Sequence, residues 1–556
     1  MKSSPSRRPS FLSGVSVLTL SALVVKVIGL FYRIPMLDQL GTEGMGYFNT
    51  AYELYALFCV ISTAGLPVAM SVLISGLEAE GRGHEVGRVF RISLGLFALL
   101  GGGGCALLWG LSKPFATLLG NPAAAASMGA IAPTVLFICL SSAFRGYFQG
   151  RRQMLPTAIS QVMEAAGKLF LGLTLAAYAR SVGKDLPTTA AYAVLGLTLG
   201  TGCSVIYLWA HKTVSSKRET VIAPLTPQEK PRSVLRPLLA TAIPVTASAG
   251  IISLTKCVDL ALILRRLQDL GHTAAYASSM YGCYSTLAVP LFNILPSLTT
   301  SVAMSAVPAL SAALKRGKEG ENELKRTAMT SLGLTLAIAI PAALGLSVFS
   351  RDILFLLFPH QPEAVEMASP WLSCLGLSVP AACLLTVTGA MLQAAGKANR
   401  PMISMLAGVA VKTVLAYVLL GVDGWGMAAI PFSSLVCDGV ALTVNFIFVF
   451  RHAPAMLPDA KGAAFLAGVP TLFATVAVSP VKIARRLLNG ETITSAHTLI
   501  TVMAVAGLYA LGWLTVYLLR KRLPIYKNEG NRDGQAVSSQ DVKKGKDHET
   551  THERTA

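Results

Sequence analysis

The chain has 556 residues, of which 53% are hydrophobic and only 13% are charged, yet its formal net charge is +19. Soluble proteins carry roughly a quarter charged residues, and basic nucleic-acid-binding proteins mix their basic clusters with polar and aromatic side chains. Here short basic clusters alternate with apolar runs of about twenty residues, which excludes both classes and favours an integral membrane protein with no nucleic-acid partner.

Fourteen apolar stretches are long enough to cross a bilayer as helices, since a span needs about 20 apolar residues. The two at 47–75 and 276–303 are long enough to tilt or kink. Barrel strands would need short segments of alternating hydrophobicity, and the sequence has none, so the expected fold is all-α and polytopic. The predicted spans are 11–31, 47–75, 91–111, 125–147, 156–179, 188–209, 238–264, 276–303, 327–349, 367–391, 402–420, 426–450, 462–480 and 496–519.

The distribution of Lys and Arg predicts the orientation, because these residues concentrate on the cytoplasmic side of a membrane. With the N-terminus inside, the inner segments hold 33 of the 47 Lys and Arg residues and the outer loops hold 10. Both termini are therefore expected in the cytoplasm, and the polar tail at 520–556 is expected to be disordered.

Sequence patterns typical of catalysis or metal binding have simpler interpretations here. His548 to His552 match the HExxH zinc pattern, but a zinc site needs a structured helix and a third ligand, so this match in the tail is attributed to chance. The glycines at 101–104 and at 196 and 200 lie in apolar spans and indicate close helix packing. We expect no cofactor, no metal and no enzymatic activity.

Charged residues inside the predicted spans are the strongest functional signal. Each costs about 2.5–3.5 kcal/mol at the bilayer centre on insertion scales, so they are expected to have partners or a use. Four are lysines and four are acids: Lys26, Lys168, Lys256 and Lys412, with Glu53, Glu164, Asp259 and Asp438.

Two interpretations of these charges remain open. Glu164 and Lys168 are four residues apart, and Lys256 and Asp259 are three apart, so each pair shares a helix face and can neutralise itself. Lys26 and Lys412 have no acid within a turn, which favours a water-filled cavity or an anionic ligand.

An internal repeat groups the lysines in pairs. A shift of 244 residues aligns FQGRRQMLPTAIS with LQAAGKANRPMIS and places Lys168 on Lys412, and a weaker match with a shift of 230 places Lys26 on Lys256. Two six-helix lobes at 11–210 and 238–450 are therefore predicted, joined by a cytoplasmic linker at 211–237, with two further spans at 461–519. Transporters built from repeats place their substrate site between the halves.

Several segments resemble the multidrug/oligosaccharidyl-lipid/polysaccharide exporter superfamily, which is MATE-like. They are VKVIGLFYRIPML, GTEGMGYFNTAYELY, RGYFQGRRQMLPTAISQVME, SSMYGCYSTLAVPLFNILPSLTTSVAMSAVPALS, LQAAGKANRPMISMLAGVAVKTVLAYVLL and DGWGMAAIPFSSLV. Within the superfamily the chain is most similar to the stage V sporulation and polysaccharide-biosynthesis branch, which is similar to lipid II flippases.

This resemblance implies a two-lobed fold around a cationic cavity in the cytoplasmic membrane of a bacterium. The implied substrate is a polyprenyl-diphosphate-linked saccharide, a peptidoglycan, spore-cortex or polysaccharide precursor, with its tail in membrane lipid. Cell-wall or spore-cortex synthesis proteins are the implied partners. The expected head-group contacts are Lys26, Arg33, Lys256 and Lys412, with Lys168 secondary.

The acids are expected to set the local charge or to couple an ion, Na⁺ or H⁺, or else the membrane potential drives transport. Asp259 resembles an acid at which some relatives bind a cation, but the partner acid expected in the eleventh span is absent. Glu53 stands where the flippase family carries a basic residue. A drug/cation antiporter of the same superfamily and a non-transporting scaffold for spore or wall assembly are the competing functions.

Overall fold

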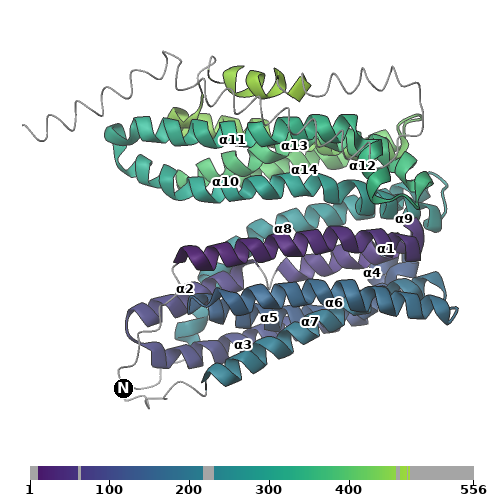
Figure 1. The fold of residues 1–556 in the computed structure, drawn as a ribbon, viewed down its shortest axis with the longest axis horizontal. Coiled ribbons are helices and arrows are strands. Elements are labelled where there is room, and N and C mark those ends of the chain that lie inside the picture. Colours follow the sequence, from purple (N-terminus) through teal and green to yellow (C-terminus); the bar gives the residue numbers. More distant parts are fainter. Residues whose placement is uncertain are drawn as a thin grey trace, which may run out of the picture. The chain divides into compact units, whose positions relative to one another are not determined.

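The structure is a computed structural model that describes residues 11–60, 64–216 and 231–458 and most of 462–475. Every regular element in these ranges is helical (Figure 1), which confirms the predicted all-α class. Ten helical segments of the described chain are long and apolar enough to cross a membrane, one of which, Leu20–Val60, covers parts of the predicted first and second spans. The fourteenth predicted span and the end of the thirteenth lie outside the described residues.

The helices fall into a first half, α1–α7, and a second half, α8–α15. The first half consists of α1 (Phe11–Val60), α2 (Leu66–Ala79), α3 (Val86–Gly110), α4 (Ser112–Leu118), α5 (Ala125–Gly150), α6 (Met154–Ser181) and α7 (Leu186–Ser216). The second half consists of α8 (Pro231–Asp269), α9 (Ala274–Cys283), α10 (Val289–Lys315), α11 (Glu321–Val348), α12 (Ser350–Leu357), α13 (Pro362–Ala394), α14 (Arg400–Leu420) and α15 (Ala429–His452).

The loop expected between the first two spans is instead almost entirely helical. Helix α1 runs from Phe11 to Val60 and leaves helical geometry only at Gly41, where φ is +64°. Glycine adopts this conformation without a Cβ penalty, so the chain changes direction within a single residue. Met36 and Leu37 are fully buried, and their burial holds the expected loop inside the fold.

Both of the long predicted spans contain π-helical residues. In the second, residues 64 and 65 are π-helical and lead into α2, which begins at Leu66 with a proline in its first turn. The eighth contains a π-helical turn, Tyr284–Ala288, between α9 and α10. Such turns bend a helix and are frequent at functional sites.

Glycines bring α6 and α7 into backbone contact, as the glycine spacing predicted. A Cβ on Gly196 would lie 2.1 Å from the Gly172 nitrogen, and one on Gly200 would lie 2.8 Å from the Gly167 Cα. Only glycine permits so close a crossing between membrane helices. Figure 1 shows α5, α6 and α7 side by side, and their mutual packing fixes α6, which carries Glu164 and Lys168.

Candidate functional site

The Lys168 ammonium lies above three aromatic rings of α1. Its Nζ is 4.6 Å from the ring centroid of Tyr52, 4.9 Å from that of Tyr32 and 5.5 Å from that of Phe48. Tyr32 precedes the break at Gly41, and the other two rings follow it. Aromatic faces attract a cation but carry no net charge, and Lys168 has no ion pair within the described chain. Lys168 therefore lies against uncharged rings and interacts with Glu164 and Glu53 only through longer-range electrostatics.

Glu164 pairs with Arg145 of α5 rather than with Lys168 on its own helix. The Arg145 Nη2 lies 2.9 Å from Glu164 Oε2, and the Arg145 Nε donates a 2.9 Å hydrogen bond to the Ser160 hydroxyl. The planar guanidinium donates to both acceptors from N–H groups held in a fixed fork. The ion-pair partner of Glu164 is therefore Arg145, which was not predicted from the sequence, and Glu164 acts on Lys168 only through a longer-range electrostatic interaction.

Removing Arg145 is expected to destabilise the first half, because the pair is largely sheltered, with side chains 11% and 21% exposed. The Arg145→Ala variant leaves the Glu164 carboxylate unpaired, at a cost of roughly 2–3 kcal/mol. Its thermal unfolding midpoint in detergent should fall by several degrees. Arg145→Ala/Glu164→Ala should regain most of the loss, and an equal fall in both variants would contradict the pairing.

Lys412 and Asp259 form an ion pair between α14 and α8. The Lys412 Nζ is 2.5 Å from Asp259 Oδ2, and only 9% of the lysine side chain is exposed. One open interpretation paired Asp259 with Lys256 on its own helix, and no acid lies within a turn of Lys412 along the sequence. The structure instead pairs Asp259 with Lys412, because α8 and α14 pack together in the fold.

Arg33 and Glu53 lie on the two limbs of α1, on either side of Gly41. The Arg33 Nη1 donates a 2.7 Å hydrogen bond to the Ser285 carbonyl in the π-helical turn, so it joins the two halves. Glu53 interacts electrostatically with Lys256, Arg33, Asp259 and Lys168. It is therefore the acid that most of the predicted cations share.

Lys26 on α1 and Lys256 on α8 are exposed, and neither forms an ion pair with a described residue. Asp438 on α15 is half-buried and interacts electrostatically with Lys412. Once the two ion pairs are set aside, four of the predicted cations and two of the acids remain without an ion pair among the residues described. The candidate site therefore keeps an excess of positive charge.

A group of small polar side chains, called here the polar joint, connects α1 with α9 and the π-helical turn. The Asn49 amide donates 2.9 Å hydrogen bonds to the hydroxyls of Ser285 and Thr286. The Thr42 and Ser279 hydroxyls are 2.6 Å apart. The remaining members are Asn121, Thr50 and Ser278, which are linked by hydrogen bonds from the Asn121 amide.

Two glycines bring the backbones together inside the polar joint. A Cβ on Gly282 would lie 1.9 Å from the Thr42 carbonyl oxygen, and a Cβ on Gly46 would lie 2.1 Å from the Ser278 carbonyl oxygen. This contact was not predicted from the sequence. Asparagine and hydroxyl residues at the ends of apolar spans were the available signal, since such groups hydrogen-bond across membrane helices.

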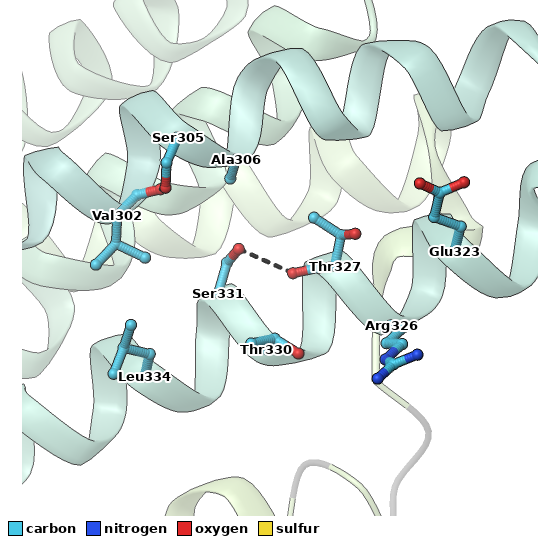
Figure 2. Close-up of a pocket in the computed structure, with 9 residues that line it drawn as sticks. All are labelled: Val302, Ser305, Ala306, Glu323, Arg326, Thr327, Thr330, Ser331 and Leu334. Carbon is cyan, nitrogen blue, oxygen red and sulfur yellow. Dashed lines mark hydrogen bonds between the residues drawn. The ribbon is translucent and has the colours of Figure 1, made fainter. Parts of the chain in front are cut away.

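A pocket of about 430 Å³ lies between α10 and α11, away from all of these residues. Figure 2 shows Ser305 and Ala306 on one helix facing Ser331 and Thr327 on the other, with Arg326 beside them. None of the predicted site residues lines it. Among the residues that the structure describes, no group of three or more His, Cys, Asp or Glu side chains is arranged to hold a metal ion.

The chain matches the models of two known protein families. The family model described as polysaccharide biosynthesis protein matches residues 11–314, and the MatE model matches residues 285–418. The first match covers more than half of the chain. The chain belongs to the polysaccharide biosynthesis protein family. It is therefore a multi-pass membrane protein of the superfamily indicated by the sequence.

Among curated proteins, two Bacillus subtilis relatives match most of the chain. The chain is 26% identical to stage V sporulation protein B over 455 residues, which is 79% of this chain and 84% of that protein. It is 25% identical to the lipid II flippase MurJ over 469 residues, covering 80% of this chain and 83% of that protein.

Solved structures share the fold at lower sequence identity. A lipid II flippase MurJ in an inward closed conformation matches with a TM-score of 0.66 and 14% identity, over 91% of this chain and 99% of that one. An inward-facing multidrug resistance MATE family transporter matches with a TM-score of 0.63 and 15% identity, over 80% of this chain and 98% of that one. The MATE-like fold predicted from the sequence is therefore confirmed, although the count of fourteen spans is not.

Proposed function

We propose that this protein moves a polyprenyl-diphosphate-linked saccharide across the bacterial cytoplasmic membrane by alternating access. The observation that carries the proposal is the Lys168 ammonium above three aromatic rings, with Arg33 close enough to act on it electrostatically. These two cations repel each other in a medium of low dielectric, while Glu164 and Glu53 act on Lys168 with the opposite sign. A diphosphate between them would remove that repulsion.

The charge balance of the site favours an anionic substrate. A diphosphate cannot enter hydrocarbon without compensating positive charge, because an unpaired buried charge is costly. Lysine offers a compact point charge and arginine a planar donor fork, and both suit phosphate oxygens. Lys26 and Lys256, both exposed, would then guide the head group, and Lys412 is the least available of the five because Asp259 already holds it.

The polar joint supports a transport cycle in which the two halves separate at one end. In the predicted topology Gly41 and the α8–α9 connection lie on the outer side of the membrane. The polar joint would therefore close the space between the two halves at the outer face. Hydrogen bonds between hydroxyl and amide groups contribute about 0.5–1.5 kcal/mol each, and such contacts can be exchanged within a cycle. The substrate would enter from the inner leaflet and leave when the joint opens.

The identity of the saccharide follows from the relatives only as a class. Stage V sporulation protein B and the lipid II flippase MurJ are similar over most of the chain, so a peptidoglycan or spore-cortex precursor is the substrate we propose. Proteins that synthesise wall or cortex would supply and consume it. Depleting the protein should cause one polyprenyl-diphosphate saccharide to accumulate in the inner leaflet, and unchanged lipid-linked intermediates would contradict the proposal.

A drug/cation antiporter is the second candidate, and the match of the MatE model to residues 285–418 favours it. A site for cationic drugs should present carboxylates in excess. Among the described site residues, the cations without an ion pair outnumber the acids without an ion pair. Drug-stimulated proton exchange in proteoliposomes, without movement of lipid-linked saccharide, would establish the antiporter instead. Activity in neither assay would point to a scaffold.

A further inference from the structure

Lys412 lies between acids that belong to two other helices of the second half. It forms its ion pair with Asp259 of α8 and acts electrostatically on Asp438 of α15. The residue is only 7% exposed. The other titratable groups that interact with this cluster are Glu53, Tyr281, Tyr284, Cys383 and Cys437.

Two sheltered carboxylates with hydroxyl groups nearby are the kind of oxygen ligands that hard cations prefer. Tyr284 lies in the π-helical turn and interacts electrostatically with both Asp259 and Lys412. In this protein the centre of the arrangement holds a covalently attached ammonium. A mobile cation at the same place would be repelled by Lys412 and would find the nearest oxygen of Asp259 already engaged.

We propose that Lys412 is a tethered cation that takes the place of an exchangeable Na⁺ ion or proton between Asp259 and Asp438. Lys412 then neutralises Asp259 throughout the cycle, and the protein binds no coupling cation at this cluster. The consequence for transport rests on the proposed function, whereas the absence of cation binding does not.

The first half shows that a lysine at this repeat position does not require an acid. Lys168, the counterpart of Lys412, lies over aromatic rings, and the residue that corresponds to Asp259 under the second shift is Gly29. A lysine that forms no ion pair leaves its charge available to a ligand, whereas a lysine that is paired with an acid does not. The two halves therefore assign different tasks to equivalent lysines.

The test removes the ammonium and asks whether a free cation replaces it. Purified full-length protein is compared in Na⁺ and in choline at roughly 100 mM, because a ligand that binds only the native state raises the unfolding midpoint. The wild type should show no saturable difference. Lys412→Met should gain several degrees in Na⁺ or on acidification. The matched variant Lys168→Met removes a lysine that forms no ion pair with a described acid, and it should gain nothing.

Two results would overturn the proposal. One is a saturable Na⁺ stabilisation of the wild type that Asp259→Asn abolishes. The other is a folded Lys412→Met protein whose midpoint is the same in Na⁺ and choline and at every pH. Should Lys412→Met be unstable, the prediction becomes a higher yield of folded protein when it is purified in Na⁺, and Lys412→Met/Asp259→Asn should fold without that requirement.

A transport assay distinguishes a failure of this proposal from a failure of the proposed function. Wild-type flipping should be unchanged when choline replaces Na⁺ on both sides of the membrane. Flipping that stops in choline contradicts the tethered cation but leaves the flippase in place. A protein that flips nothing contradicts the proposed function, while the unfolding experiment still tests Lys412.

Discussion

Replacing Lys168 by methionine is expected to reduce flipping of a polyprenyl-diphosphate saccharide by about 30-fold or more. Truncating one partner of a buried charge pair costs about 2–5 kcal/mol, and each 1.4 kcal/mol is a factor of ten. Methionine keeps the apolar packing against Tyr32 and Tyr52 but removes the charge that lies above them. Flipping in proteoliposomes, with thermal unfolding as a check on folding, measures the effect.

Two variants serve as controls for Lys168→Met. Lys168→Arg keeps a cation that also stacks on aromatic faces and should retain part of the activity. Lys212 on α7 lies 4.1 Å from the Phe90 ring centroid, outside the cluster, so Lys212→Met should flip at nearly the wild-type rate. An inactive Lys212→Met, or a fully active Lys168→Met, would show that the unpaired charge of Lys168 is not what matters.

Cross-linking the polar joint is expected to stop transport completely. The Thr42 and Ser279 hydroxyl oxygens are 2.6 Å apart, so Thr42→Cys/Ser279→Cys places two thiols close to the separation of a disulfide. Oxidation would prevent α1 and α9 from separating, and reduction should restore flipping. The exposed native thiol Cys203 is replaced by serine in this variant so that it does not compete for oxidation.

The single variants Thr42→Cys and Ser279→Cys, treated with the same oxidant, should remain active. If the linked protein forms its disulfide in full and still transports, then the polar joint does not open during the cycle. That outcome would remove alternating access at this end from the account, although it would leave the charge argument for Lys168 intact.

Hydropathy alone was sufficient to predict the helical class and most of the spans. A helix of about 20 apolar residues is the simplest way to satisfy every backbone group in hydrocarbon. The same reasoning failed at the α1 turn, because the expected loop is mostly helix and bends only at Gly41. Hydropathy does not indicate that the apolar side chains of a short connection, such as Met36 and Leu37, will be buried against other helices.

The interaction partners of the charged residues could not be predicted from their spacing in the sequence. The repeat predicts that Lys168 and Lys412 are equivalent, but it could not show that one lies over aromatic rings and the other beside Asp259. Spacing along one helix identifies only side-chain pairs that are three or four residues apart. The partners that the structure reveals, Arg145 for Glu164 and Asp259 for Lys412, come from other helices.

The most direct test of the central claim is whether transport depends on the anionic linkage of the lipid. Purified protein in liposomes is given a short-chain polyprenyl-diphosphate saccharide, or the same saccharide on the same chain through an uncharged linkage. We predict that the diphosphate lipid crosses at least about tenfold faster than the lipid with the uncharged linkage, as expected for one charge-assisted contact. Lys168→Met should remove the difference between the two rates. Equal rates for the two lipids in the wild type would contradict it.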